Sequence, residues 1–253
     1  MDTPTFFAFF LVFVRAGAML MASPFMGRNV PVQVRVWLSA AVALAFMPVV
    51  KGHLGPVPTD LYSLVYSVGY EALMGIVLGF CLQAFAMAGQ MAGSYLDVQL
   101  GIGSAQVLNP TLGIPVSILS QFKFMLVILL LFLSDAHLLM FQAFIASFGL
   151  GHSAGLESLP GMSTSLTSLV GQLGLLSLQM AAPVAAVCLV VDCAAALVNK
   201  AVPQMQVFQV MVPAKSALGI IALAMALPIM VVVVKGGVTM TFNGFEQLFA
   251  GGR

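Results

Sequence analysis

The stretch LYSLVYSVGYEALMGIVLGFCLQAFAMAGQM, residues 61–91, decides the fold class of this chain. Glu71 is its one charged residue, in an apolar run longer than the roughly 20 residues that a helix needs to cross a bilayer. Of all 253 residues, 61% are hydrophobic and only 7% are charged, whereas soluble domains carry about 25% charged residues. We therefore expect an all-α, polytopic membrane protein.

Six further apolar runs, bracketed by proline, glycine and charged residues, complete the predicted set of seven helical segments. They cover residues 5–22, 34–50, 118–133, 136–150, 166–198 and 217–234. Two of the seven exceed one regular crossing and two fall short of it, so we expect bent helical hairpins. Pro183 lies in the middle of the run 166–198, where it should kink or break the helix. The connections are too short for a soluble domain, which predicts a single domain over residues 1–253.

Two G-x-x-x-G matches, Gly75 to Gly79 and Gly89 to Gly93, lie in the third helical segment and at its end. Their starts are 14 residues apart (89 − 75 = 14), which is close to four helical turns and places both pairs on nearly one face. Glycines let a neighbouring backbone approach closely, so we predict a helix interface, either internal or between subunits. The alternative is that glycine is simply frequent in membrane helices.

Three acidic residues, Glu71, Asp97 and Asp192, lie within or at the ends of apolar runs. An ionisable group in hydrocarbon costs about 2.5–3.5 kcal/mol on insertion scales, so each of them needs a partner or water. We expect hydrogen bonds or ion pairs with Lys123, Lys200 or a neighbouring subunit. A proton or ion pathway stays open as an alternative.

Several function classes find no support in the sequence. The net charge of +1 leaves no basic face for a phosphate backbone, so nucleic acid is not expected as a partner. His53, His137 and His152 do not show metal-ligand spacing. We therefore predict no enzyme and no catalytic, metal or cofactor site.

A family resemblance follows from motifs that occur in order along nearly the whole chain. They include EALMG at 71–75 with Gly79, AGQ at 88–90 through QLG at 99–101, and the pair Asn109-Pro110. KAVPQMQVF at 200–208, followed by PAK at 213–215, is the most specific match. The chain resembles the FliR family of the flagellar type III secretion system and its injectisome homologue SctT. The residues that carry the family motif are Glu71, Asp192, Lys200, Pro203, Gln204, Phe208 and Lys215.

Three places depart from the usual pattern of this family. Lys200 stands where arginine is common, Gln206 stands where asparagine is common, and Asp135-Ala136-His137 stands where the family usually has a glycine before its histidine. Lysine keeps the positive charge but lacks the planar donor fork of arginine, which puts any bidentate contact at this position in doubt.

The resemblance implies a structural subunit of a helical export gate. Its expected partners are FliP-like and FliQ-like membrane subunits, an FlhB-like export-switch protein, unfolded flagellar proteins as substrates, and the lipid bilayer. The expected location is the bacterial inner membrane at the flagellar basal body. Two alternatives stay open: an injectisome gate of the SctT type, and a small-molecule or ion secondary transporter, in which we would expect paired repeats that this sequence does not show.

The resemblance also aligns residues 103–117 with the loop that plugs the family's channel. This segment is apolar, fixed by prolines and interrupted by glycines, which suits a displaceable seal against water and ions. The residues expected to form the plug are Gly103, Val107, Leu108, Asn109, Pro110, Leu112, Ile114 and Pro115.

Overall fold

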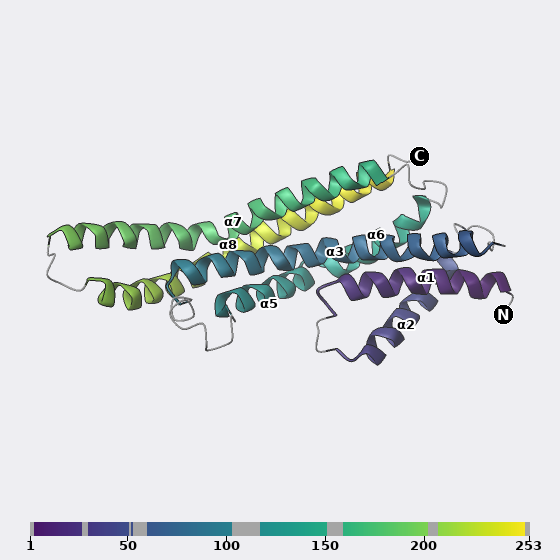
Figure 1. Ribbon diagram of the computed structural model, residues 1–253, viewed down its shortest axis with the longest axis horizontal. Coiled ribbons are helices and arrows are strands. Elements are labelled where there is room, and N and C mark those ends of the chain that lie inside the picture. Colours follow the sequence, from purple (N-terminus) through teal and green to yellow (C-terminus); the bar gives the residue numbers. More distant parts are fainter. Residues whose placement is uncertain are drawn as a thin grey trace. The chain divides into compact units, whose positions relative to one another are not determined.

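The chain folds into helices throughout the part that the computed structural model describes, residues 3–26, 30–50, 52, 60–102, 117–150, 159–201 and 207–250 (Figure 1). The α-helices are α1 (Thr3–Ala22), α2 (Val32–Val50), α3 (Leu61–Gln99), α5 (Ile118–Leu133), α6 (Ala136–Ala146), α7 (Leu159–Ala201) and α8 (Val207–Ala250), and a 3₁₀ helix, η3 (Ser147–Leu150), follows α6. These ranges contain no strand. The predicted all-α class and all seven helical segments are confirmed.

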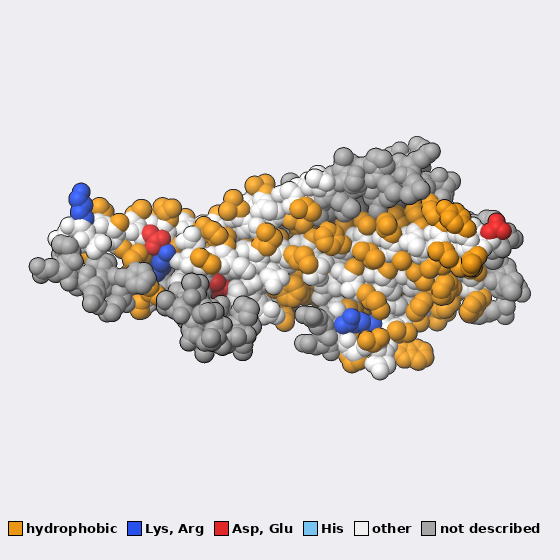
Figure 2. Space-filling model, in the orientation of Figure 1, with side chains coloured by type: hydrophobic (Ala, Val, Ile, Leu, Met, Phe, Trp, Pro, Cys, Tyr) orange, Lys and Arg blue, Asp and Glu red, His pale blue; other side chains and the backbone are white. Residues whose placement is uncertain are grey.

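Five of these helices, α1, α2, α3, α7 and α8, are long and apolar enough to cross a membrane. The bent pair α5 and α6 makes a sixth candidate span. On the face that Figure 2 shows, many of the described side chains are hydrophobic and few are charged. The chain is a polytopic membrane protein, as predicted from its composition.

The helices divide into two compact units that cut across the order of the chain. Unit 1 holds Met1–Ala84, Leu131–Val170 and Val238–Arg253, and unit 2 holds Phe85–Leu130 and Gly171–Gly237. Helices α3, α5, α7 and α8 therefore contribute residues to both units. The single domain expected from the sequence stays a prediction.

Each unit has its own apolar core. In unit 1, α1 packs against α2, and α2 also contacts α6, where the Phe46 and Phe141 rings stack with their centroids 5.7 Å apart. Fully buried side chains of unit 1 include Val12, Ala16, Met19, Leu82 and Phe144. Those of unit 2 include Phe85, Leu96, Val127, Met180, Val184 and Cys188. Close van der Waals packing of these apolar side chains holds the helices of each unit together, because lipid supplies little hydrophobic drive between membrane helices.

Helix α3 continues beyond the apolar run that ends at Met91, because polar residues after Met91 make hydrogen bonds. The Ser94 hydroxyl donates to the Gln90 carbonyl at 3.0 Å, and the Asp97 carboxylate accepts hydrogen bonds from the start of α5. The chain leaves the helix at Gly101, whose φ of 72° is a left-handed conformation that favours glycine.

Of the two outcomes expected at Pro183, a kink or a break, the break does not occur, since α7 runs through this proline without interruption. Helix α8 likewise contains Pro213 and Pro228. Membrane helices tolerate prolines where neighbouring groups supply hydrogen bonds to the freed backbone. A sharp turn does occur at Ser134 and Asp135, between α5 and α6, and Asp135 takes a left-handed φ of 54° there.

The four glycines of the two G-x-x-x-G matches lie against two different helices of the same chain. In unit 1, a Cβ added at Gly75 would lie 2.3 Å from the Arg15 carbonyl oxygen of α1. A Cβ at Gly79 would lie 2.2 Å from the Met19 carbonyl oxygen. These are backbone atoms, so the neighbouring helix would have to move as a whole to admit a side chain.

In unit 2, the second pair lies against α5. A Cβ added at Gly93 would lie 2.4 Å from the Ser120 Cα, whereas a Cβ at Gly89 would first meet a methyl group of Val127 at 2.5 Å. A side-chain methyl can yield more easily than a backbone atom. Gly93 is therefore the stricter of the two positions.

Replacing Gly79 with alanine should destabilise the protein by about 1–3 kcal/mol, the usual cost of forcing a methyl group into a closed contact. Thermal unfolding in detergent should show a lower midpoint for Gly79→Ala. Gly69 of the same helix provides the matched control, because nothing lies within 4 Å of its added Cβ. Gly69→Ala should leave the midpoint unchanged or raise it slightly, and equal losses in both variants would refute the close contact.

Candidate functional site

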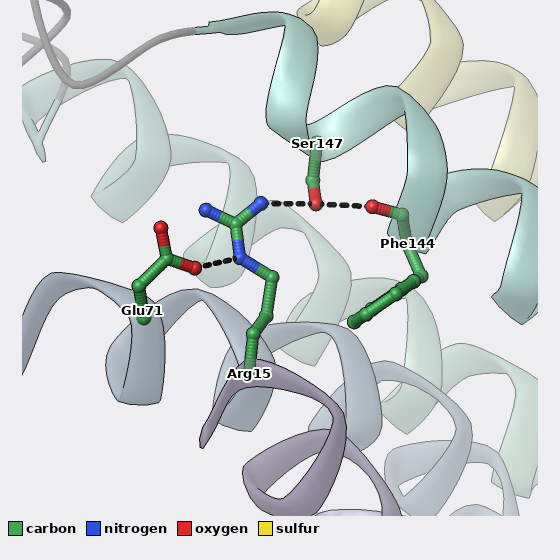
Figure 3. Close-up of polar contacts among 4 residues, drawn as sticks. All are labelled: Arg15, Glu71, Phe144 and Ser147. Atoms are coloured by element: carbon green, nitrogen blue, oxygen red, sulfur yellow. Dashed lines mark hydrogen bonds and ion pairs between the residues drawn. The ribbon is translucent and has the colours of Figure 1, made fainter. Parts of the chain in front are cut away.

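A buried ion pair joins α1 and α3 in unit 1 (Figure 3). Arg15 Nε donates to Glu71 Oε2 at 2.5 Å, and the two residues are 1% and 0% exposed. Both side chains come from helices that are otherwise apolar, so neither charge would be tolerated without the other. The pair leaves this part of α1 and α3 electrically neutral.

The guanidinium group of Arg15 has further partners that follow α6. Its Nη1 donates to the Ser147 hydroxyl at 2.7 Å, and that hydroxyl donates to the Phe144 carbonyl at 2.7 Å (Figure 3). Its Cζ lies 3.7 Å from the centroid of the Phe148 ring, which is a cation–π contact. One arginine thus ties α1, α3 and the α6–η3 segment together within unit 1.

Glu71 could be singled out from the sequence, but its partner Arg15 could not. The expected partners of the carboxylates were Lys123, Lys200 or a neighbouring subunit, whereas Arg15 neutralises Glu71 and Lys215 neutralises Asp192 in the structure. The available signal was Arg15 itself, a charged residue within the apolar run 5–22. Ser147 and Phe148 carried no signal, because a serine and a phenylalanine are ordinary residues at a helix end.

Asp97, in the last turn of α3, caps the start of α5 in unit 2. Its carboxylate accepts from the backbone N–H groups of Leu119 and Ser120, both at 3.4 Å, and from the Ser117 hydroxyl. The first N–H groups of a helix have no partner in the helix, and a carboxylate there also suits the helix dipole. Asp97 therefore fixes the residues on both sides of the segment 103–116.

A second ion pair joins α7 and α8 in unit 2. Lys215 Nζ lies 2.7 Å from both carboxylate oxygens of Asp192. The Asp192 side chain is 44% exposed and that of Lys215 only 13%. Two residues of the family motif, 23 positions apart in the chain, are thus brought together.

The remaining motif residues are not assembled into a site in the described part of the chain. Lys200 is exposed near the end of α7. Phe208 lies in α8, but its side chain is outside the described residues, as are Pro203 and Gln204. The whole set expected to plug a channel also lies outside them: Gly103, Val107, Leu108, Asn109, Pro110, Leu112, Ile114 and Pro115.

The two ion pairs neutralise charged side chains of neighbouring helices. Among the described residues, no three His, Cys, Asp or Glu side chains lie close enough together to hold a metal ion. The ion pairs and the Asp97 cap select which apolar helices pack together. Any other pairing of the helices would leave a charged side chain without a partner in a medium of low dielectric constant.

Arg15→Met should destabilise the protein strongly, by about 3–5 kcal/mol, because it leaves the Glu71 carboxylate buried without its cation. The double variant Arg15→Met with Glu71→Met should recover most of this loss, because it removes both charges. Resistance of the protein to protease in membranes measures both effects. If the double variant is as sensitive as the single one, the ion pair does not account for the loss.

Asp97→Ala should cost about 1–2 kcal/mol, in the range of a lost helix cap. Asp97→Asn keeps one side-chain oxygen as an acceptor and should retain most of the stability. Hydrogen exchange at the first turn of α5 measures this directly, and exchange should rise in the alanine variant only. Equal exchange in the two variants would contradict the capping role.

Comparisons with known proteins match nearly the whole chain. Residues 6–240 match the family described as "Bacterial export proteins, family 1". A flagellar biosynthetic protein FliR of Caulobacter vibrioides is 31% identical over 86% of this chain and 87% of its own. Proteins of the same name from Bacillus subtilis and Escherichia coli are 29% and 25% identical, over 96% and 87% of this chain and 95% and 84% of theirs. The resemblance found in the sequence is thereby confirmed, and the chain belongs to the FliR family of bacterial export proteins.

Proposed function

We propose that this chain is a structural subunit of the flagellar protein export apparatus. The observation that carries this proposal is the family match over residues 6–240, together with relatives named flagellar biosynthetic protein FliR that cover most of the chain. In this proposal the chain moves unfolded flagellar proteins as part of a conduit, and it has no catalytic chemistry of its own.

The finer proposal is that the chain assembles with FliP-like and FliQ-like subunits at the entrance of the channel, next to an FlhB-like export-switch protein. Its place would be the inner membrane at the flagellar basal body. The outer surfaces of α2, α7 and α8 support an assembly, because large apolar side chains such as Trp37, Leu197 and Met225 are more than 70% exposed. Apolar helices with so much open surface need lipid or other membrane helices around them.

The segment 103–117 is proposed as the seal of this channel. The supporting geometry lies at its two sides, where Asp97 of α3 and Ser117 before α5 are hydrogen-bonded to each other. A loop held at its base can be displaced by a substrate and return to the same position. The apolar residues of the segment suit contact with a passing polypeptide better than with water.

A tagged chain, purified in mild detergent from cells that assemble flagella, should retain FliP-like and FliQ-like subunits. Cells that lack the chain should also fail to export flagellar proteins into the medium. A lone chain that is stabilised by a small solute would instead support a secondary transporter, and copurification with injectisome proteins would support the SctT-type gate.

Shortening the segment 104–114 should make the membrane leak ions or small solutes, because the proposed seal would no longer close. Conductance of the membrane, measured with and without the shortened chain, tests this. A matched variant keeps the length but replaces Gln106 with asparagine and should not leak. Unchanged conductance of the shortened variant in an assembled complex would refute the seal and leave the subunit assignment standing.

A further inference from the structure

The outward face of α7 carries a regular row of exposed residues. Along the candidate membrane span Val170–Ala201 they recur at alternating spacings of three and four, the a/d pattern of a helix that packs lengthwise against another. We call this row the α7 seam, and it consists of Gln172, Leu175, Gln179, Ala182, Ala186, Leu189, Cys193 and Ala196. The opposite face of α7, with Met180, Val184 and Cys188, is buried in unit 2. The seam is therefore a second packing face, which the described part of this chain leaves open.

The α7 seam suits neither water nor lipid. Leu175 and Leu189 are each more than half exposed, so water on this face would meet large apolar side chains. Gln172 and Gln179, seven residues apart, are exposed as well, and acyl chains would leave their amide donors and acceptors without partners. Another membrane helix meets both needs, because it packs against the leucines and can hydrogen-bond the amides.

Asp192 lies beside the seam, one residue before Cys193. It is bound to Lys215 of α8, yet its side chain remains nearly half exposed. A carboxylate that is open to hydrocarbon is costly, whereas a helix with a donor opposite would cover it. In paired helices the positions that flank an a/d seam carry the charged residues that select the partner. Asp192 thus also favours a protein neighbour along this face.

The outward face of α8 is of a different kind. Its large exposed side chains include Ile221, Met225, Ile229 and Val232. Residues 218–234 are all apolar, so this stretch of α8 has no amide or charged side chain to satisfy. Acyl chains can cover such a face without leaving any polar side chain unpaired.

We propose that the α7 seam docks a membrane helix of a different, neighbouring subunit, and that the outward face of α8 lies against lipid. The inference rests on the proposed function, since an export apparatus supplies such subunits. The partner helix carries hydrogen-bonding side chains at the level of Gln172 and Gln179. It carries large apolar side chains at the level of Ala182 and Ala186, where the small residues of α7 leave room for them.

A second copy of this chain fits the α7 seam less well. In a parallel pair each residue faces its own counterpart, so leucine meets leucine and alanine meets alanine, and large and small side chains do not interdigitate. In an antiparallel pair along the whole seam, Gln179 faces Leu189, and its amide has no partner. The complementary helix therefore has another sequence.

Photocrosslinking in membranes of cells that assemble flagella identifies what covers each face. A diazirine amino acid replaces Leu189 of the seam in one variant and Met225 of α8 in the other. The Leu189 variant should give an adduct with another membrane protein, and the Met225 variant should give adducts with phospholipid. Mass spectrometry of the purified chain distinguishes the two.

Overfilling the seam provides the second test. Ala186→Leu should lower the amount of copurifying subunit about tenfold, the factor that corresponds to the usual cost of an overpacked contact. Ala224→Leu is the matched control, because Ala224 is an exposed alanine of α8, and it should leave copurification unchanged. Both isolated chains should keep the native thermal midpoint, because neither side chain lies in the core of unit 2.

Four results would overturn the proposal. They are a phospholipid adduct at Leu189, an adduct with a second copy of this chain, a Leu189 variant that gives no adduct, and equal copurification of Ala186→Leu and Ala224→Leu. If the native chain still retains its subunits in these cases, the proposed function stands and only the docking face is wrong. A native chain that retains no subunit and gives no protein adduct would refute both.

Discussion

A charged side chain in an apolar helix has to be neutralised or hydrogen-bonded by another helix, and this constraint decides which helices of this chain meet. Glu71 is neutralised by Arg15, Asp192 is neutralised by Lys215, and Asp97 caps α5. Each contact joins two helices, and no contact between apolar side chains alone would be as selective. Close packing of apolar side chains holds the helices together, but these few polar groups choose among the possible packings.

At two places along α3, an acidic side chain that contacts another helix lies one turn from a glycine at which that helix approaches closely. In unit 1, Glu71 lies one turn before Gly75, where α1 approaches; in unit 2, Asp97 lies one turn after Gly93, where α5 approaches. In both places the glycine removes the bulk that would hold the neighbouring helix away from the polar group. The small residues and the charges of α3 are therefore satisfied inside one chain, and the open surfaces of α2, α7 and α8 are left for the surroundings.

Composition and hydropathy were sufficient to predict an all-α membrane protein with seven helical segments, because apolar runs are local features. The partner of Glu71 could not be predicted, since Arg15 is 56 residues away and only the packing of α1 on α3 brings it close. The length of α3 depends in the same way on groups from another helix. The family motif did identify Asp192 and Lys215, although it gave no reason for their contact.

Disulfide formation between α3 and α5 tests most directly whether the polar and small residues of α3 are satisfied within one chain. The Ser94 and Ser120 hydroxyl oxygens are 3.2 Å apart, so cysteines at both positions would be close enough to bond. With the three native cysteines replaced by alanine, mild oxidation of Ser94→Cys/Ser120→Cys in membranes should give a chain of monomer mass without free thiols. A crosslinked dimer, or two thiols that stay free, would contradict the account.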